Sequence, residues 1–156
     1  MTEEAFARAV EEYGDTLFRV AYSCLRNRSD AQDVMQETLL KFYMEKKPFQ
    51  SPQHEKRWLI RVAVNESKKL LRSAWRRRSV PLEEREEAVT FDTLAQRALF
   101  EEVMALPPKY RLAVYLYYYE SFSVRQIAQA LGANPSTVQT WLMRARGLLR
   151  ESLQEA

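Results

Sequence analysis

The sequence predicts an all-α fold of two small helical domains joined by a flexible linker, and three observations carry this prediction. Only three of the 156 residues are glycine, which argues against a sheet-rich fold with many tight turns. Runs of alternating apolar and polar residues are hard to find, whereas apolar residues recur at three- and four-residue intervals, as on the buried face of a helix. The composition is also rich in Ala, Leu, Arg, Glu and Gln, which favour helices.

The N-terminal half should form three helices. The first is predicted from about Glu3 to Leu25, and in the polar break that follows Ser29 or Asp30 can cap the second helix. The second helix should end at Lys47-Pro48, and a long third helix should run from near residue 53 to about residue 77. The side chains expected to pack in these helices are Phe6, Val10, Tyr13, Leu17, Val20, Ala21, Cys24, Val34, Met35, Leu39, Phe42, Tyr43, Trp58, Leu59, Val62, Ala63 and Leu70.

Residues 79–91 are predicted to be a linker between a domain of residues 1–78 and a domain of residues 92–156. This segment contains Pro81, few apolar residues and an acidic run at 83–87, which fits a solvated helix start about as well as an extended chain. Helical periodicity restarts at residue 91 or 92 and is broken at Leu106-Pro107-Pro108. Pro108 suits the first turn of the next helix, where its missing N–H costs nothing, and two short helices should follow.

Those two short helices are typical of a helix-turn-helix. Ser123 and Gln126 fit a capping box, and Gly132 can adopt the positive φ that the turn requires. The buried sides should be formed by Ile127, Ala128, Leu131, Val138, Leu142 and Ala145. The opposite face of the second helix carries Ser136, Gln139, Thr140, Met143, Arg144 and Arg146, side chains suited to phosphates and base edges. A purely structural hairpin would bury the same residues without needing this outer face, so DNA binding is the favoured interpretation.

Charge is segregated along the chain, although the net charge is only +3. Residues 41–80 hold twelve Lys and Arg against three Asp and Glu, whereas residues 1–40 and 81–120 each hold four against eight. The basic block also contains Phe42, Tyr43, Phe49, Trp58 and Trp75, and aromatic rings can stack on unpaired bases. Trp58 also fits a core position, and residues 76–78 also fit a cationic helix end. The size of the surplus nevertheless favours a nucleic acid partner.

Several functional classes are excluded by what the sequence lacks. Cys24 is the only cysteine, which rules out an internal disulfide and fits a reducing cytoplasm. His54 is the only histidine, and no Cys/His cluster, catalytic triad or Gly-rich phosphate loop is present, so neither an enzyme, a metal site nor a cofactor is expected. No apolar run is long enough to span a bilayer, so direct membrane insertion is not expected and a cytoplasmic location is.

With these residues in view, nearly the whole chain resembles the extracytoplasmic-function (ECF) sigma factors. The segment from Asp30 to Thr38, DAQDVMQET, looks like the acidic segment of that family's first domain. The resemblance implies that Asp33, Gln36 and Glu37 contact the clamp-helices coiled coil of the largest polymerase subunit. The residues alone would describe only a solvated helix face.

The segment from Arg57 to Asn65, RWLIRVAVN, looks like the family's promoter-opening helix. The resemblance implies that this helix and the preceding loop, residues 47–53, engage the minus-ten element of the promoter. One base would flip out into a pocket lined partly by the loop and by Asn65. The other residues expected to hold this strand are Arg61, Lys68, Lys69 and Arg72.

Two segments of the second half are similar to the same family. Leu106–Arg111 and Tyr119–Ser123 resemble the opening of its second domain, which implies a helix that docks on the polymerase flap. Residues 136–146 match the recognition helix for the minus-thirty-five element, which implies DNA contacts from Ser136, Thr137, Gln139, Thr140, Met143, Arg144 and Arg146. The family usually has Gly at Ser136, a basic residue at Gln139 and Arg at Trp141, so this chain lacks two cations that bind phosphates.

The resulting hypothesis is an alternative-type sigma factor that binds core RNA polymerase and directs promoter-specific transcription initiation. The resemblance implies core RNA polymerase, promoter DNA and an anti-sigma factor as partners, and no cofactor. The alternative is a one-component helix-turn-helix regulator with a sensor or receiver half. A receiver would need a parallel sheet and a phosphoacceptor Asp after an apolar strand, whereas the first half shows helical periodicity.

Overall fold

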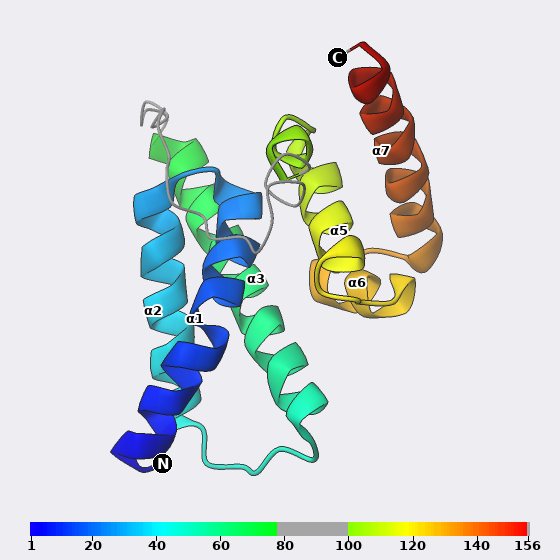
Figure 1. Cartoon of the computed structure of the whole chain (residues 1–156). Coiled ribbons are helices and arrows are strands. Elements are labelled where there is room, and N and C mark those ends of the chain that lie inside the picture. Colours follow the sequence, from blue (N-terminus) through cyan, green and yellow to red (C-terminus); the bar gives the residue numbers. More distant parts are fainter. Residues whose placement is uncertain (78–99, 156) are drawn as a thin grey trace. The chain divides into compact units, whose positions relative to one another are not determined.

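The computed structural model describes the backbone of residues 1–77 and 100–155 and the side chains of residues 1–73 and 100–152. Within these residues the regular elements are all helices (Figure 1). The chain divides into two compact units, Met1–Val89 and Thr90–Ala156, so the predicted all-α fold with two small domains is confirmed. The expected linker at 79–91 and the helix start at residue 91 or 92 lie outside the described residues.

The N-terminal unit contains three helices, α1 (Glu3–Leu25), α2 (Arg28–Met44) and α3 (Pro52–Arg77), and each packs against the other two. Thr2 caps α1, and Arg26 ends it in the left-handed conformation. The predicted caps of α2 are wrong. Asn27 is the cap instead, and its Oδ1 accepts from the Asp30 backbone N–H at 2.8 Å. The turn at Arg26 brings the chain directly into α2, so the helix begins before Ser29.

Most side chains that were predicted to pack in the N-terminal unit are buried or half-buried, but two of them are exposed. Val10 and Tyr43 are 40% and 41% exposed, because they lie at the edge of the buried stripe of their helices. On α3 the fully buried residues include Ile60 and Val64, which were not predicted, while Trp58 is half-buried. The helix α2 ends at Met44 rather than at residue 47, because Glu45 is extended.

The C-terminal unit begins, in its described part, with helical residues 100–104, followed by α5 (Pro108–Tyr118), α6 (Val124–Leu131) and α7 (Pro135–Glu155). Pro108 lies in the first turn of α5, as predicted. Both bonds of the capping box at Ser123 are present, and Gly132 ends α6 with φ of 68°. The helix α7 has 21 residues and is therefore not short. It packs against both α5 and α6.

The buried positions of this helix-turn-helix match the predicted ones closely. Ile127, Val138 and Ala145 are completely buried, and Leu142 is nearly so. Their burial fixes the orientation of α7, because moving any of them outward would return a large apolar surface to water. The outer face of α7 is therefore held at a defined angle to α6.

Candidate polymerase and promoter interfaces

The exposed face of α2 carries the three residues expected to contact the polymerase. Asp33, Gln36 and Glu37 are all exposed and, at three- and four-residue spacing, share one side of the helix. The opposite side, with Ala31, Val34, Thr38 and Phe42, is buried. The helix thus presents two carboxylates and an amide on a rigid scaffold.

Two apolar residues that sequence reasoning missed continue this face. Leu40 and Met44 are 49% and 67% exposed, and they lie one and two turns beyond Gln36 and Glu37. We call Asp33, Gln36, Glu37, Leu40 and Met44 the α2 face. Their register, out of step with the buried stripe, was a signal that could have identified them. An acidic patch continued by large exposed apolar side chains is suited to a protein partner rather than to DNA.

The outer side of α3 carries the residues expected to bind the minus-ten strand. Arg61, Asn65, Lys69 and Arg72 are exposed and Lys68 is half-buried, at spacings that place them along one flank of the helix. The expected cations at residues 76–78 and the ring of Trp75 lie outside the described side chains. The described part of α3 therefore offers three exposed cations and one amide to an anionic strand.

An ion-pair cluster joins α2 to this basic flank. One oxygen of Glu66, Oε2, accepts from Lys41 Nζ at 2.6 Å and from Lys69 Nζ at 3.1 Å. Burial raises the pKa of Glu66, but the hydrogen bonds from the two lysines outweigh it and hold the pKa below its ordinary value. The hydrogen bond to Glu66 likewise raises the pKa of Lys41. Lys69, expected on DNA, is thus already held by a neighbouring carboxylate.

The start of α3 is anchored to α1 as well. The Tyr13 hydroxyl donates to Glu55 Oε2 at 2.6 Å, and burial together with this carboxylate raises the pKa of Tyr13. Tyr13 is therefore neutral at physiological pH and acts as a hydrogen-bond donor. This contact ties the first turn of α3 to α1.

The outer face of α7 presents most of the predicted DNA-binding residues together. Ser136, Gln139, Met143 and Arg144 are exposed, whereas Thr137 and Thr140 are half-buried. The Thr140 hydroxyl donates to the Ser136 carbonyl at 3.1 Å, so it faces a ligand only as an acceptor. Met143 is 62% exposed, which leaves an apolar side chain available for contact with a base.

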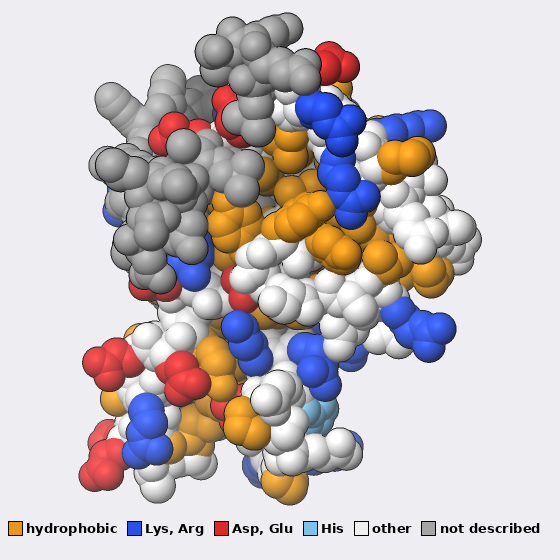
Figure 2. Space-filling model, turned by 45° about the vertical axis from the view of Figure 1, so that its right-hand side comes forward, with side chains coloured by type: hydrophobic (Ala, Val, Ile, Leu, Met, Phe, Trp, Pro, Cys, Tyr) orange, Lys and Arg blue, Asp and Glu red, His pale blue; other side chains and the backbone are white. Residues whose placement is uncertain are grey.

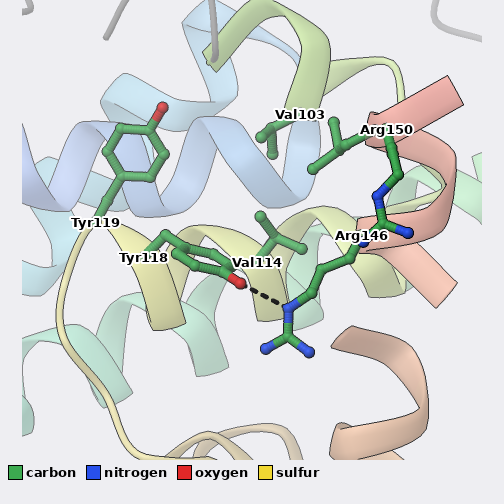
Figure 3. A pocket seen from close by; sticks show the side chains of 7 residues that line it. Val103, Val114, Tyr118, Tyr119, Arg146 and Arg150 are labelled. Atoms are coloured by element: carbon green, nitrogen blue, oxygen red, sulfur yellow. Dashed lines mark hydrogen bonds between the residues drawn. The ribbon is translucent and has the colours of Figure 1, made fainter. Parts of the chain in front are cut away.

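Arg146 is engaged differently from the other predicted residues of α7. Its Nε donates to the Tyr118 hydroxyl at 2.6 Å, and its guanidinium lies 5.8 and 5.9 Å from the ring centres of Tyr117 and Tyr118. In Figure 3 its terminal nitrogens point away from Tyr118. This link between α7 and α5 was not predicted, because it joins residues 28 positions apart.

Arg146 also borders a pocket of about 370 Å³, which lies between helical residues 100–104, α5 and α7. The pocket is lined by Val103, Val114, Tyr118, Tyr119, Arg146, Leu149 and Arg150. Its walls are apolar, and two guanidinium groups lie at its edge (Figure 3). Figure 2 shows the same combination on the surface, with hydrophobic side chains edged by Lys and Arg in the upper half of the view.

Arg111, within the segment Leu106–Arg111, is 5% exposed and donates to the Leu106 carbonyl at 3.1 Å. It stabilises the turn before α5, and its burial leaves little of the side chain exposed for contact with another protein. Among the described residues, no group of His, Cys, Asp and Glu is arranged to hold a metal ion, and no helix is long and apolar enough to cross a membrane.

Two family models match the chain, one to each unit. Sigma-70 region 2 matches residues 9–77, and Sigma-70, region 4 matches residues 96–149. The RNA polymerase sigma-E factor of Streptomyces coelicolor is 33% identical over 95% of this chain and 85% of its own length. The RNA polymerase sigma factor SigV of Bacillus subtilis is 26% identical over 97% of this chain and 93% of its own.

Two solved structures share the fold. The sigma factor RpoE of Bartonella quintana, in complex with the anti-sigma factor NepR, has a TM-score of 0.78 at 22% identity, covering 97% of this chain and 98% of that one. CnrH, in complex with the cytosolic domain of CnrY, has a TM-score of 0.62 at 22% identity, covering 99% and 90%. At this identity the likeness is one of fold.

The paired helical units and the two matched regions define a sigma-70-type transcription initiation factor, a class without catalytic activity of its own. Within that class, the chain belongs to the ECF sigma factors. The ECF RNA polymerase sigma factor SigW of Bacillus subtilis matches 98% of this chain and 91% of its own length at 26% identity, beside the 33% identical sigma-E factor described above. It is an alternative sigma factor that directs RNA polymerase to promoters. The alternative hypothesis of a one-component regulator is wrong, because region 2 occupies the half in which a sensor domain was considered.

Proposed function

We propose that the two domains divide the work of initiation, with residues 1–78 docking on core polymerase and opening the minus-ten element, and residues 92–156 binding the minus-thirty-five element. The linker would comprise residues 79–91. The observation that carries this proposal is the separation of charge within the N-terminal unit. The α2 face is acidic and apolar, whereas α3 exposes Arg61, Lys69 and Arg72.

The α2 face is the surface proposed to dock on the clamp helices of the polymerase. Asp33 and Glu37 would accept from cationic side chains of the partner, and Gln36 would add a neutral hydrogen bond. Leu40 and Met44 would supply the apolar area that charged contacts lack, since desolvated apolar anchors contribute much of the affinity at protein interfaces. All five side chains project from a single helix, so docking requires little reorganisation.

The flank of α3 is the surface proposed to hold the melted minus-ten strand. Arg61, Lys68, Lys69 and Arg72 would bind successive phosphates, and the exposed Asn65 amide can both donate to and accept from a flipped base. This placement agrees with the aromatic cluster of Phe42, Phe49 and Trp58, which stiffens the segment before α3.

The helix α7 is the proposed reader of the minus-thirty-five element. Ser136, Thr137, Gln139, Thr140, Met143 and Arg144 would enter or border the major groove. Arg144 suits guanine, Gln139 suits adenine, and the Met143 side chain can contact a thymine methyl group. Arg146, held by Tyr118 through Nε, would reach a phosphate with its terminal nitrogens and position the protein rather than read sequence.

A second contact with the polymerase and one further partner are proposed for the protein. The pocket beside α5 and α7 would receive an apolar segment of the polymerase flap, as the resemblance of Leu106–Arg111 and Tyr119–Ser123 implies, and its apolar lining supports this. An anti-sigma factor would compete for the same surfaces. This proposal is supported by the structure of RpoE from Bartonella quintana, which is in complex with the anti-sigma factor NepR. The protein would act in the cytoplasm, where core polymerase and the chromosome are.

The test is charge reversal on the α2 face in the full chain. D33K and E37K should each weaken binding to core polymerase by about 2 kcal/mol or more, or roughly 30-fold in Kd, because the partner's cation is left opposite a like charge. E11K, at an exposed carboxylate of α1, is the matched control and should leave core affinity unchanged. Affinity can be measured by fluorescence anisotropy of labelled protein titrated with core. Wild-type affinity in both D33K and E37K would refute the docking assignment.

A further inference from the structure

The segment between α2 and α3 is held in shape by side chains that bond to its own backbone. Glu45 Oε1 accepts from Lys47 N at 3.2 Å, and Ser51 Oγ accepts from His54 N at 3.1 Å. His54 Nδ1 in turn accepts from Gln50 N at 3.1 Å. The Ser51 carbonyl accepts from Glu55 N at 3.0 Å, which makes Ser51 the cap of α3. Residues 45–51, which we call the α2–α3 segment, are thus ordered without regular secondary structure.

The same imidazole also packs against the aromatic anchor of this segment. Phe49 is half-buried, with its ring centre 5.8 Å from Phe42, 5.4 Å from Trp58 and 5.4 Å from His54. His54 therefore contacts two successive residues of the segment, Phe49 through an edge-type ring contact and Gln50 through Nδ1. His54 thus links the first turn of α3 to both of these residues.

The arrangement is a variant of a capping box. In the usual form, the side chain at the third helical position accepts from the backbone N–H of the cap residue itself. Here His54 occupies that third position but accepts from Gln50, one residue before the cap Ser51. This hydrogen bond adds Gln50, a residue of the α2–α3 segment, to the capped structure at the start of α3. Because Nδ1 accepts this bond, it carries no hydrogen, and the hydrogen of the neutral ring lies on Nε2.

We propose that His54 is a positioning residue for promoter opening, which fixes Phe49 and Gln50 in the shape that receives the melted non-template strand. This inference rests on the proposed function of α3 and the segment before it. A segment that is ordered before binding loses little conformational entropy when the strand arrives, so its contacts appear more fully as affinity. Removing the Nδ1 acceptor leaves the Gln50 N–H without its partner and allows the segment to sample other shapes.

Three substitutions distinguish this positioning role from a direct DNA contact through Nε2 and from a role of the ring contact alone. H54F keeps a ring against Phe49 but removes the acceptor. H54N loses the ring but places an oxygen near the position of Nδ1, whereas H54Q places its polar atoms nearer to the position of Nε2. If His54 instead contacted DNA through Nε2, H54Q would be the variant that retains binding. If the ring contact alone mattered, H54F would retain it.

The experiment uses holoenzyme assembled from core polymerase and the full-length variant chain. The probe is a labelled single-stranded oligonucleotide that carries the non-template minus-ten sequence of a promoter mapped for this protein. We expect H54F and H54Q to bind it roughly 5- to 10-fold more weakly, as expected for one lost hydrogen bond, and H54N to recover most of the loss. Hydrogen exchange of the Gln50 amide in the free chain should accelerate by a similar factor in H54F and H54Q only. Core affinity should stay unchanged in all three.

The opposite outcomes are equally definite. Wild-type oligonucleotide affinity in H54F, together with faster Gln50 exchange, would overturn the inference, and so would retention of binding by H54Q but not by H54N. R61A and N65A serve as references for the proposed function. If they weaken binding and H54F does not, only the inference on His54 fails; if neither weakens it, the assignment of α3 fails first. Should H54F not fold, H54N against H54Q decides, because both lack the ring and differ in where the acceptor lies.

Discussion

The substitution E66Q should lower the stability of the N-terminal unit while raising its affinity for DNA. Glu66 is 14% exposed and binds two ammonium groups with one oxygen, Lys41 at 2.6 Å and Lys69 at 3.1 Å. Glutamine keeps the size and one acceptor oxygen but removes the charge. The two lysine side chains are 41% and 59% exposed, so solvent screens much of the attraction, and we expect a loss of about 1 kcal/mol.

The dependence on pH follows from the two shifted groups. The pKa of Glu66 lies below its ordinary value of 4.5, so its contribution is complete above that pH and is lost as the pH falls through the lower pKa of the folded state. The pKa of Lys41 lies above its ordinary value of 10.5, so its contribution is complete below that pH and is lost as the pH rises through the raised pKa. The difference between wild type and E66Q is therefore largest between these limits and shrinks in acid.

Urea denaturation can measure this effect in a W141F background. The remaining Trp58 and Trp75 both lie on α3, so their fluorescence reports on the N-terminal unit. With a slope of about 2 kcal/mol/M, a loss of 1 kcal/mol moves the midpoint by about 0.5 M. The double-mutant cycle of E66Q with K41M isolates the ion pair from other effects of either change. An unchanged midpoint at neutral pH, or a difference that persists undiminished in acid, would refute the reasoning.

The second readout of E66Q concerns DNA. In the wild type, the Glu66 carboxylate competes with phosphate for Lys69 and repels the strand. Removing this charge in E66Q should therefore strengthen the binding of single-stranded minus-ten DNA by the holoenzyme. The logarithm of affinity should also fall more steeply with the logarithm of salt concentration, because Lys69 then releases a further counterion. Weaker binding by E66Q would show that Glu66 serves mainly to hold Lys69 in position.

Three further predictions concern the C-terminal unit. R144A should reduce discrimination among minus-thirty-five sequences by about 1–3 kcal/mol, measured by competition between duplexes, and an unchanged specificity ratio would remove Arg144 from the readers. G132A should destabilise this unit by about 1–2 kcal/mol because φ is 68°, whereas G147A, inside α7 with free space around it, should stabilise it by about 0.5–1 kcal/mol; equal melting shifts would contradict this. S123A should cost about 1 kcal/mol by thermal melting, through loss of the bond to Gln126 N, and an unaltered melting temperature would exclude a role for the cap.

Features set by neighbouring residues were predictable from the sequence. The capping box at Ser123, the turn at Gly132 and the position of Pro108 depend on bonds within four residues, so the local pattern contains the information. The buried stripe of α6 and α7 is equally local, because helical spacing decides which side chains share a face. The cap of α2 was wrong for a related reason. Asn27, Ser29 and Asp30 can all cap a helix by their chemistry. The left-handed turn at Arg26 starts the helix early, so that Asn27 becomes the cap.

Features that join distant residues were not predictable. Glu66 meets Lys41 across 25 positions, Tyr13 meets Glu55 across 42, and Arg146 meets Tyr118 across 28. No helical period relates these pairs, since their proximity arises only when the helices pack. For the same reason the sequence correctly placed Arg146 on the exposed side of α7 but gave no sign of its hydrogen bond to Tyr118 of α5. The roles of the site residues themselves came from family resemblance and remain predictions.

The structure also explains how promoter preference can diverge on a constant fold. Val138, Leu142 and Ala145 stabilise α7 from within, whereas Gln139 and Met143 are exposed and bury little area in the free protein. Replacing a family cation at Gln139 therefore changes phosphate or base contacts at almost no cost in folding energy. Trp141 differs, because it is half-buried and contributes to packing as well as to the surface. A substitution of Gln139 by arginine should consequently alter DNA affinity alone, while one of Trp141 by arginine should alter stability and affinity together.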